Sequence, residues 1–448
     1  QIFLLSLHFE PLPDVTMGKG AEGASATKAE PANQDVLING RLYDVGNFKH
    51  PGGSVIKFLT NGGDATEAFV EFHGRSKKAQ HVLKGLESRE APAEVMKARG
   101  FNGKEELTKD FAQLRRELKD EGFFEPNMAH IVFRVAEIVA MHALGAWLFI
   151  NGGSSMASLQ SLLGVLCLGV VSGRCGWLMH EGGHYSLTGK IATDRALQIM
   201  IYGIGCGMSG AWWRNQHNKH HATPQKLKHD VDLDTLPLLA FNEKIAVKAR
   251  HPFLKAWLRH QAFLFTPVSC LLVALGWQYF LHPRHVMRTN RVHTEGLALA
   301  VRHLLFFGGL CAGLTWGQSA GVYIAYNTIA SAYIFSQFAM SHTHLPVSEA
   351  DSYLHWVEYA ALHTTNIKSG HLKSVDWLMS YLNFQIEHHL FPGMPQFRHP
   401  MVSPRVKALF AKHGLPYDER GYFPCLRDTW MNLHVVGQSV DKPKPKKA

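Results

Sequence analysis

Long apolar runs alternate with polar segments through the middle of the chain. Two of these runs, residues 131–150 and 156–178, are long enough to cross a bilayer as helices, which takes about 20 apolar residues. The uncharged segment NGGSS joins them. We therefore expect a hairpin of two membrane-spanning helices that dips to the far side of the membrane.

Three further apolar runs compete for a second hairpin, at residues 261–281, 297–316 and 320–340. The first is followed by the strongly basic HPRHVMRTNR, whereas residues 317–320, between the second and third, carry no charge. Because Lys and Arg gather in cytoplasmic loops, we predict that the second and third runs form the hairpin. The first run then lies along the interface or re-enters the membrane. In the alternative, the first run spans and a later one does not.

The beginning of the chain lacks such runs and is soluble in character. It contains the strand-like VLINGRLYDV, a Gly-rich HPGG turn and short helical segments. Asp64 followed by Glu67 resembles a capping box, which opens a helix that reaches His73. A charged helical segment follows at residues 104–121, and its charges predict a solvated face.

These patterns divide the chain into five parts. By residue number, we expect a disordered tail at 1–35, a small α+β domain at 36–90, a helical linker at 91–129, an all-α membrane domain at 130–436 and a basic disordered tail at 437–448. Residues 1–16 lack the basic start and the small-residue cleavage site of a signal peptide. Met17 looks like the natural start, so we expect residues 1–16 not to be native.

Composition limits the class of protein. The 448 residues predict two or three folding units at roughly 100 to 200 residues each. Only 18% of the residues are charged and 46% are apolar, which excludes a disordered or fibrous chain. A mean hydropathy of −0.09 is too polar for a chain embedded entirely in a membrane. The net charge of +10 indicates loops that face anionic lipid rather than a nucleic-acid partner. Six scattered cysteines indicate neither disulfides nor thiolate metal sites.

Histidine is the unusual residue, with 28 copies, and it gathers in three clusters. These are HEGGH at 180–184, HNKHH at 217–221 and QIEHH at 385–389, all in segments that the predicted topology places on the cytoplasmic side. Residues three or four apart share a helix face, so the imidazoles of a cluster can reach one metal ion. The seven donors are His180, His184, His217, His220, His221, His388 and His389. One zinc ion takes three or four ligands, so the count favours two metals, and imidazole suits iron as well as zinc or copper.

HEGGH also matches the helical HExxH pattern of zinc proteases, in which the Glu is the general base. Two adjacent glycines cost a helix about 1 kcal/mol each, and a three-ligand zinc site would leave the other two clusters without a role. We therefore favour a dinuclear site that activates oxygen beside a bilayer, and keep a membrane zinc protease as a distant alternative.

A separate pair of histidines lies in the soluble part of the chain. His50 opens the HPGG turn, and His73 ends the segment Glu71-Phe72-His73. Four phenylalanines are near them in the sequence, namely Phe48, Phe58, Phe69 and Phe72. Two axial nitrogens and an apolar pocket are what a bis-imidazole haem needs. Taken alone, however, HPGG could be a turn and nothing more.

The segment KHPGG followed by Phe72-His73 resembles the haem domain of cytochrome b5, and the three histidine clusters resemble those of membrane fatty-acid desaturases. With a third cluster that begins with Gln, the chain is identified as a member of the front-end desaturases over residues 36–436. The resemblance implies haem b with His50 and His73 as axial ligands. It implies two non-haem irons held by His180, His184, His217, His220, His221, His388 and His389, together with His342 rather than His344. Whether Gln385 binds metal or holds a neighbour stays open.

The family also implies an activity. Such enzymes use O2 to remove two hydrogens from an acyl chain and insert a cis double bond between an existing one and the carboxyl end. Electrons would come from NADH through a separate cytochrome b5 reductase, because no Gly-rich dinucleotide fingerprint follows a strand in this chain. The partners would be membrane lipids and a long polyunsaturated acyl substrate linked to CoA or phospholipid. HEGGHYSLTG, WWRNQHNKHH, DVDLDTLP and SHTHLPV are most like microalgal Δ5 desaturases of twenty-carbon chains, with Δ6 enzymes of eighteen-carbon chains as the alternative.

The expected fold is a small α+β cytochrome b5-like domain followed by an all-α membrane domain. The membrane domain would have four transmembrane helices in two hairpins, one extra interfacial helix and a cap that carries the histidine clusters. The resemblance implies the endoplasmic reticulum membrane, with the haem domain and the active site on the cytosolic side.

Two neighbouring segments allow two interpretations each. Residues 212–215, WWRN, could contact the acyl head group, although aromatic residues at a membrane interface more commonly act as anchors. Residues 229–234, HDVDLD, could orient imidazoles from behind or form a capped turn.

Overall fold

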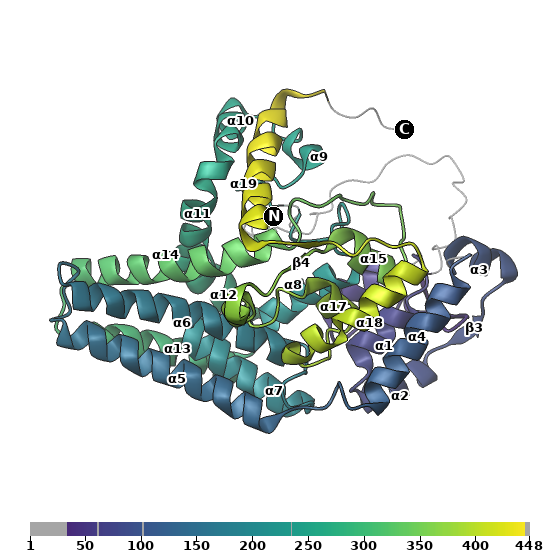
Figure 1. The fold of residues 1–448 in the computed structure, drawn as a ribbon, viewed down its shortest axis with the longest axis horizontal. Coiled ribbons are helices and arrows are strands. Elements are labelled where there is room, and N and C mark those ends of the chain that lie inside the picture. The colour runs from purple at the N-terminus through teal and green to yellow at the C-terminus, as the bar shows by residue number, and fades with distance from the viewer. Residues whose placement is uncertain (1–33, 61, 101–102, 234, 444–448) are drawn as a thin grey trace, which may run out of the picture.

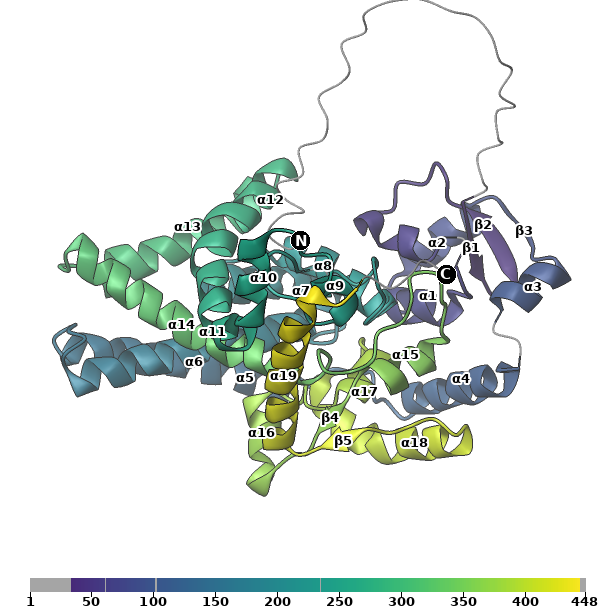
Figure 2. The same ribbon diagram turned by 90° about the horizontal axis from the view of Figure 1, so that it is seen from above.

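The computed structural model describes residues 34–60, 62–100, 103–233 and 235–443. The described chain is mostly helical, with a small three-stranded sheet near its beginning (Figure 1). Figure 2 shows this sheet at one end of the molecule and the long helices α5, α6, α13 and α14 at the other. Helices α8, α15 and α17, which carry or adjoin the histidine clusters, lie between these two ends.

The sheet consists of β1 (Asp35–Ile38), β2 (Arg41–Asp44) and β3 (Ser88–Glu90), all antiparallel and in the order β1-β2-β3. Asn39 and Gly40 join the first two strands, both with positive φ, as a two-residue hairpin turn requires. Around the sheet lie η1 (Gly53–Phe58), α1 (Thr66–His73) and α2 (Lys77–Gly85). The predicted mixture of strands and short helices is therefore present.

Helix α1 ends at His73 as predicted, but its beginning differs from the predicted capping box. Asp64 accepts the backbone N–H of Thr66 at 2.9 Å, two residues ahead, and the capping position falls to Ala65, which provides no side-chain bond. An Asp bonded to the backbone two residues on forms a local turn, so Asp64 shapes the approach to the helix instead of capping it.

The linker contains α3 (Ala93–Arg99) and α4 (Glu105–Asp120). Helix α4 is more than a solvated connector, because its buried residues recur at helical spacing: Leu107, Phe111, Leu114 and Leu118. They pack into one hydrophobic cluster with Ala68 of α1 and with residues of α15, α17 and α18. The haem-type domain, the linker and the third histidine cluster therefore share a core.

Among the described residues, three helices are long and apolar enough to cross a membrane. They are α5 (Met128–Asn151), α6 (Leu159–Gly183) and the continuous helix Gln261–Arg288, made of α11 (Gln261–Leu271), η3 (Leu272–Leu281) and α12 (His282–Arg288). The first two form the predicted hairpin. The third contains the run that was predicted to lie at the interface, and Figure 1 shows α11 crossing the direction of α6 and α14.

The second predicted hairpin needs a correction. The helix made of η4 (Val292–Gly296), α13 (Leu297–His303) and η5 (Leu304–Leu310) ends before residue 316, and α14 (Trp316–Met340) contains residues 317–320, which were predicted to be the connector. The chain turns at residues 311–315 because Gly313 adopts a positive φ and Thr315 forms a capping box with Gln318. The four-span arrangement stays a prediction.

The remaining elements surround the histidine clusters or close the chain. They are α7 (Ile191–Gln198), η2 (Ile199–Ile204), α8 (Gly210–Ala222), α9 (Glu243–Ala246), α10 (Pro252–Arg259), α15 (Trp356–His363), β4 (Asn366–Ile367), η6 (His371–Lys373), α16 (Ser374–Leu378), α17 (Gln385–Leu390), η7 (Gln396–Arg398), α18 (His399–Lys412), β5 (Glu419–Arg420), α19 (Tyr422–Gln438) and η8 (Ser439–Asp441). The predicted disordered tail at 437–448 is wrong for its first residues, because helix continues to Asp441, whose carboxylate pairs with Lys255 and Arg259 of α10. Of the tail predicted at 1–35, residues 1–33 lie outside the described residues, and its end is wrong by one residue because strand β1 begins at Asp35.

Candidate metal centre

Eight histidines from distant parts of the chain meet in two adjacent groups. In the five-histidine group, ring nitrogens lie within 4.8 Å of one another; its members are His180, His184, His217, His221 and His388. In the three-histidine group the same limit holds; its members are His220, His342 and His389. All eight histidines named from the sequence are thus brought together. His220 also lies within the same limit of the carboxylates of Asp230 and Asp232.

Helix geometry explains how three short clusters supply two groups. His217 and His221 of α8 are four residues apart and share one face, while His220 turns to the other group. On α17, the neighbours His388 and His389 also divide between the groups. Successive residues on a helix point about 100° apart because one turn takes 3.6 residues. Each of these two helices therefore contributes histidines to both groups.

The nitrogen atoms of the five-histidine group face one another. The Nε2 atom of His221 lies 3.0 Å from Nε2 of His217 and 3.0 Å from Nε2 of His388. The buried Nε2 atom of His184 has no hydrogen-bond partner in the described chain. Converging, buried ring nitrogens can all direct their lone pairs at one cation, so this donor set fits a metal ion such as iron or zinc.

Surrounding groups orient the imidazoles from behind. Asp230 accepts from Nδ1 of His220 at 3.0 Å, and the carbonyl oxygen of His363 accepts from Nδ1 of His342 at 2.9 Å. The side-chain amide of Gln396 lies 2.9 Å from Nδ1 of His180. Such contacts fix the tautomer and the ring orientation of metal ligands.

Electrostatics keeps most of these rings neutral, as metal ligands must be. Burial, followed by the neighbouring histidines, lowers the pKa of His217 and His388 well below its usual value and that of His184 to about 3. His220 is the exception. Burial acts in the same direction, but the Asp230 carboxylate outweighs it and raises the pKa of His220 to about 9.

One acidic residue of the segment HDVDLD orients an imidazole, as the first of the two interpretations expected. Asp230 is buried and holds His220, whereas the Asp232 side chain is 55% exposed and its carboxylate lies 3.5 Å from Nδ1 of His220. Asp234 lies outside the described residues. Of the two histidines compared for the last ligand, His344 belongs to neither group.

Gln385 is buried at the start of α17 and lines the cavity described below. Its Nε2 donates to the carbonyl of Leu382 at 2.9 Å, and its side chain also hydrogen-bonds with His342.

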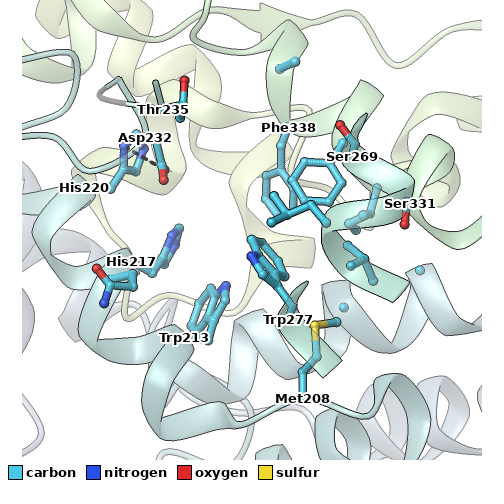
Figure 3. A pocket seen from close by; sticks show the side chains of 18 of the residues that line it. Met208, Trp213, His217, His220, Asp232, Thr235, Ser269, Trp277, Ser331 and Phe338 are labelled. Carbon is cyan, nitrogen blue, oxygen red and sulfur yellow. Dashed lines mark ion pairs between the residues drawn. The ribbon is translucent and has the colours of Figure 1, made fainter. Parts of the chain in front are cut away.

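A cavity of about 250 Å³ adjoins both histidine groups, reaching His180, His217, His220 and His342. Its other walls come from α6, α8, α11, η3 and α14 and are mostly apolar. Figure 3 shows Trp213, Trp277 and Phe338 around the space beside the histidines. The apolar walls of the cavity therefore meet the two histidine groups directly.

The tryptophans before the second cluster are not surface anchors. Trp213 is only 9% exposed and stacks on His217 with ring centroids 4.2 Å apart. Trp212 packs on His282, with ring centroids 4.5 Å apart, and lines the cavity. Asn215 points elsewhere and donates to the carbonyl of Gly52, in the HPGG turn, at 3.3 Å.

The separate pair, His50 and His73, also comes together. Their ring centroids are 5.9 Å apart, and Phe48 and Phe69 pack beside them. Burial is the main cause that lowers the pKa of both rings, that of His73 to about 4. A Cβ on Gly52 would lie 2.7 Å from the His50 ring, so this turn needs glycine. Two neutral imidazoles among phenylalanines fit the axial ligands of a haem.

Known proteins agree with this geometry. The family model "Fatty acid desaturase" matches residues 157–421, and "Cytochrome b5-like Heme/Steroid binding domain" matches residues 28–97. The chain belongs to the fatty acid desaturase family, as a front-end desaturase with a fused cytochrome b5 domain. The HExxH interpretation as a protease is therefore wrong, and Glu181 instead accepts the backbone N–H of Gln396 at 3.1 Å.

Several named desaturases are similar to this chain over most of its length. An acyl-lipid (8-3)-desaturase of Rebecca salina is 53% identical over 93% of this chain and 94% of its own length. An acyl-lipid (8-3)-desaturase of Thraustochytrium sp is 51% identical over 95% of this chain and 98% of its own length. An acyl-lipid (9-3)-desaturase of Physcomitrium patens is 29% identical over 88% of this chain and 74% of its own length.

Proposed function

We propose that this desaturase inserts a cis double bond at Δ5 of twenty-carbon polyunsaturated acyl chains, forming arachidonic and eicosapentaenoic acid. Two relatives more than half identical to it share the designation (8-3). We read this designation as the position three carbons on the carboxyl side of carbon 8, which is carbon 5. The same reading of (9-3), from a relative at 29% identity, gives carbon 6. Δ6 desaturation of eighteen-carbon linoleic and α-linolenic chains is therefore the second candidate.

The observation that carries the proposal is the direct contact between the apolar cavity and both histidine groups. Each turnover would remove two hydrogens from the acyl chain, consume one O2, two electrons and two protons, and release two waters. Two irons held by the eight histidines would supply the oxygen activation. In this proposal Gln385 is not a metal ligand but holds the ligand His342 by a hydrogen bond.

The chain's own residues have three tasks in this reaction. Trp213 and Phe338 border the cavity at the histidines and exclude water from the reacting carbons, which limits side reactions. Asp230, Gln396 and the carbonyl of His363 hold ligand rings in place. The cavity walls hold the acyl chain so that one pair of carbons faces the metal centre, which is a contribution of orientation.

The proposal also covers the supply of electrons and the membrane in which the enzyme lies. His50 and His73 would hold haem b, which receives electrons from NADH through a separate reductase. The enzyme would lie in the endoplasmic reticulum membrane, with four spanning helices and both redox sites on the cytosolic side. Its acyl carrier would be CoA or phospholipid.

Feeding experiments in yeast test the function. Cells expressing the chain receive dihomo-γ-linolenic, eicosatetraenoic (n-3), linoleic or α-linolenic acid, and their fatty acids are profiled. We expect arachidonic and eicosapentaenoic acid from the twenty-carbon feeds. γ-Linolenic or stearidonic acid alone would overturn Δ5 in favour of Δ6, and no product from any feed would overturn both candidates.

A pair of variants ties the product to the metal centre. His388→Ala should abolish the product and leave the haem spectrum intact, because His388 belongs to the five-histidine group and not to the haem pair. His344→Ala is the matched control, since His344 lies outside both groups, and it should retain product.

A further inference from the structure

The docked haem domain places one haem-ligating histidine close to the third cluster. His73 follows Phe72 at the end of α1. The ring of Phe72 packs edge-on against Trp356 of α15, with centroids 5.9 Å apart and planes at 85°. Phe72 and Trp356 both belong to the hydrophobic cluster that joins α1, α4, α15 and α17.

Trp356 continues this contact to the metal centre. It is 7% exposed, and its indole Nε1 donates to the carbonyl of Leu390 at 3.2 Å. Leu390 directly follows His389, a member of the three-histidine group. One aromatic contact and one hydrogen bond therefore connect His73 to His389, and the other links are covalent.

We propose that Trp356 is the bridge through which electrons pass from the haem to the three-histidine group. The proposal rests on the desaturase function and adds the route of its electrons. In each transfer one electron leaves ferrous haem, which becomes ferric, and reduces one ferric ion held by the histidines. Two transfers supply one turnover. Trp356 forms and breaks no bond, and it positions the path without touching the substrate.

Two further contacts between the domains offer competing routes. In one, Phe58 stacks on His229 with ring centroids 5.3 Å apart, next to Asp230, which accepts from His220. The other runs through Asn215. Asn215 donates to the carbonyl of Gly52 at 3.3 Å, two residues before His217. This path leaves the haem through His50 and enters the five-histidine group. It contains no aromatic side chain between the two histidines, because Gly52 contributes only its carbonyl and Asn215 only its amide.

Trp356 could also be a structural residue only, because it fills the shared core and satisfies a carbonyl at the end of α17. The test must therefore separate electron transfer from folding. Trp257 of α10 offers a matched control, since its Nε1 also donates to a backbone carbonyl, that of Leu238, at 2.8 Å. It packs in a different cluster, with α9 and α19.

The experiment follows the haem itself in the full-length enzyme, loaded with haem and iron. The protein is reduced without oxygen by stoichiometric dithionite and mixed with O2 and the acyl substrate, and the loss of the ferrous haem band is timed. Iron-free protein gives the background oxidation rate. Haem midpoint potential and melting temperature are measured for each variant: Trp356→Leu, Trp356→Phe, Trp257→Leu and Asn215→Leu.

We expect Trp356→Leu to slow the iron-dependent oxidation of the haem about tenfold, which corresponds to about 1.4 kcal/mol in the barrier. Trp356→Phe keeps an aromatic ring in the core and should give an intermediate rate, with an unchanged haem potential. The Trp257→Leu and Asn215→Leu variants should oxidise at the wild-type rate.

Three results would overturn the proposal: a wild-type rate in Trp356→Phe and Trp356→Leu, a larger effect from Asn215→Leu, or an equal effect from Trp257→Leu. If Trp356→Leu does not fold, Trp356→Phe decides alone. Failure of the proposed function looks different, because yeast expressing the unsubstituted enzyme would then form no product from any fed acid, while the haem rates could still be compared.

Discussion

Asp230 and Asp232 are two residues apart, yet they stand in different relations to His220. The Asp230 carboxylate is buried and accepts from Nδ1 at 3.0 Å, whereas Asp232 is largely exposed and 3.5 Å away. Only the buried carboxylate is placed to fix the ring, because it also accepts the backbone N–H of Gln225 at 2.7 Å.

This difference predicts a matched pair of variants. Asp230→Asn should lower iron binding or product formation about 10-fold to 100-fold, the usual cost of losing a group that orients a metal ligand. Asp232→Asn should have little effect. Iron per protein and product per cell measure both, and equal losses in the two variants would contradict the assignment.

A second residue-scale prediction concerns Glu67 of α1. Burial, as the main cause, raises the pKa of Glu67 to about 7 from its ordinary 4.5. The folded state thus holds the proton more tightly than the unfolded state, so the favourable contribution is complete below pH 4.5 and is lost as the pH rises through 7.

Glu67→Gln should therefore stabilise the protein at pH 8 by up to about 3 kcal/mol, at 1.36 kcal/mol per pKa unit. It should give no gain near pH 4.5. Melting temperatures of wild type and variant across this range provide the measurement, and a gain independent of pH would show that charge is not the cause.

At the residue scale the sequence predicted much of the site. Spacing identified seven histidines, and the family resemblance added His342. Neither spacing nor the resemblance identified Gln396 and His363. These residues contact the rings of His180 and His342 from segments far away in the chain. Neither residue carries a local pattern, because its role arises only when the chain folds.

At the scale of elements, α6 and α14 depend on small residues where they meet. A Cβ on Gly169 would lie 2.6 Å from the Ile329 side chain, and one on Gly173 would overlap the Tyr333 ring. Tyr333 cannot easily move, because its hydroxyl donates to the carbonyl of Leu378 and accepts from Trp177. Small residues at helix contacts are characteristic of membrane proteins.

Gly173→Ala should therefore destabilise the protein by about 1–3 kcal/mol, the typical cost of overpacking. Gly321→Ala, on α14, is the control, since a Cβ there meets nothing within 4 Å and Ala is the better helix former. Thermal melting in detergent compares the two, and equal melting temperatures would refute the role of Gly173.

The boundaries of elements were less predictable than their existence. Apolar content alone placed one run through residue 316, but Gly313 and the Thr315 capping box end one helix and begin the next. Hydropathy averages over such local backbone chemistry. Nor does hydropathy report the ion pairs of Asp441 with Lys255 and Arg259, at the end of the helical chain beyond residue 437.

At the scale of the whole molecule, the haem domain and the desaturase domain are not independent. Arg115 of α4 pairs with the buried Glu71 of α1, and both helices join the cluster that reaches α17. The sequence indicated two domains and a solvated linker. It could not show the shared core, because the buried face of α4 is only one side of a highly charged helix.

A shared core predicts joint unfolding. The loss of the haem band and the loss of helical circular dichroism should occur at one temperature, as a cooperative transition requires. Arg115→Ala should lower both midpoints together, because it leaves Glu71 buried without its partner, a change that commonly costs about 3–5 kcal/mol. Two well-separated transitions would be inconsistent with a common core.

Because the haem domain is docked on α15 and α17, its meeting with the histidine groups is not a separate encounter. A tethered donor that is already seated needs no collision with its acceptor, so the rate of that step is independent of dilution. On the proposed route, the electron-transfer encounter that stays bimolecular is the one between a separate reductase and the haem domain. Turnover in a membrane should consequently respond to the abundance of reductase and be indifferent to free cytochrome.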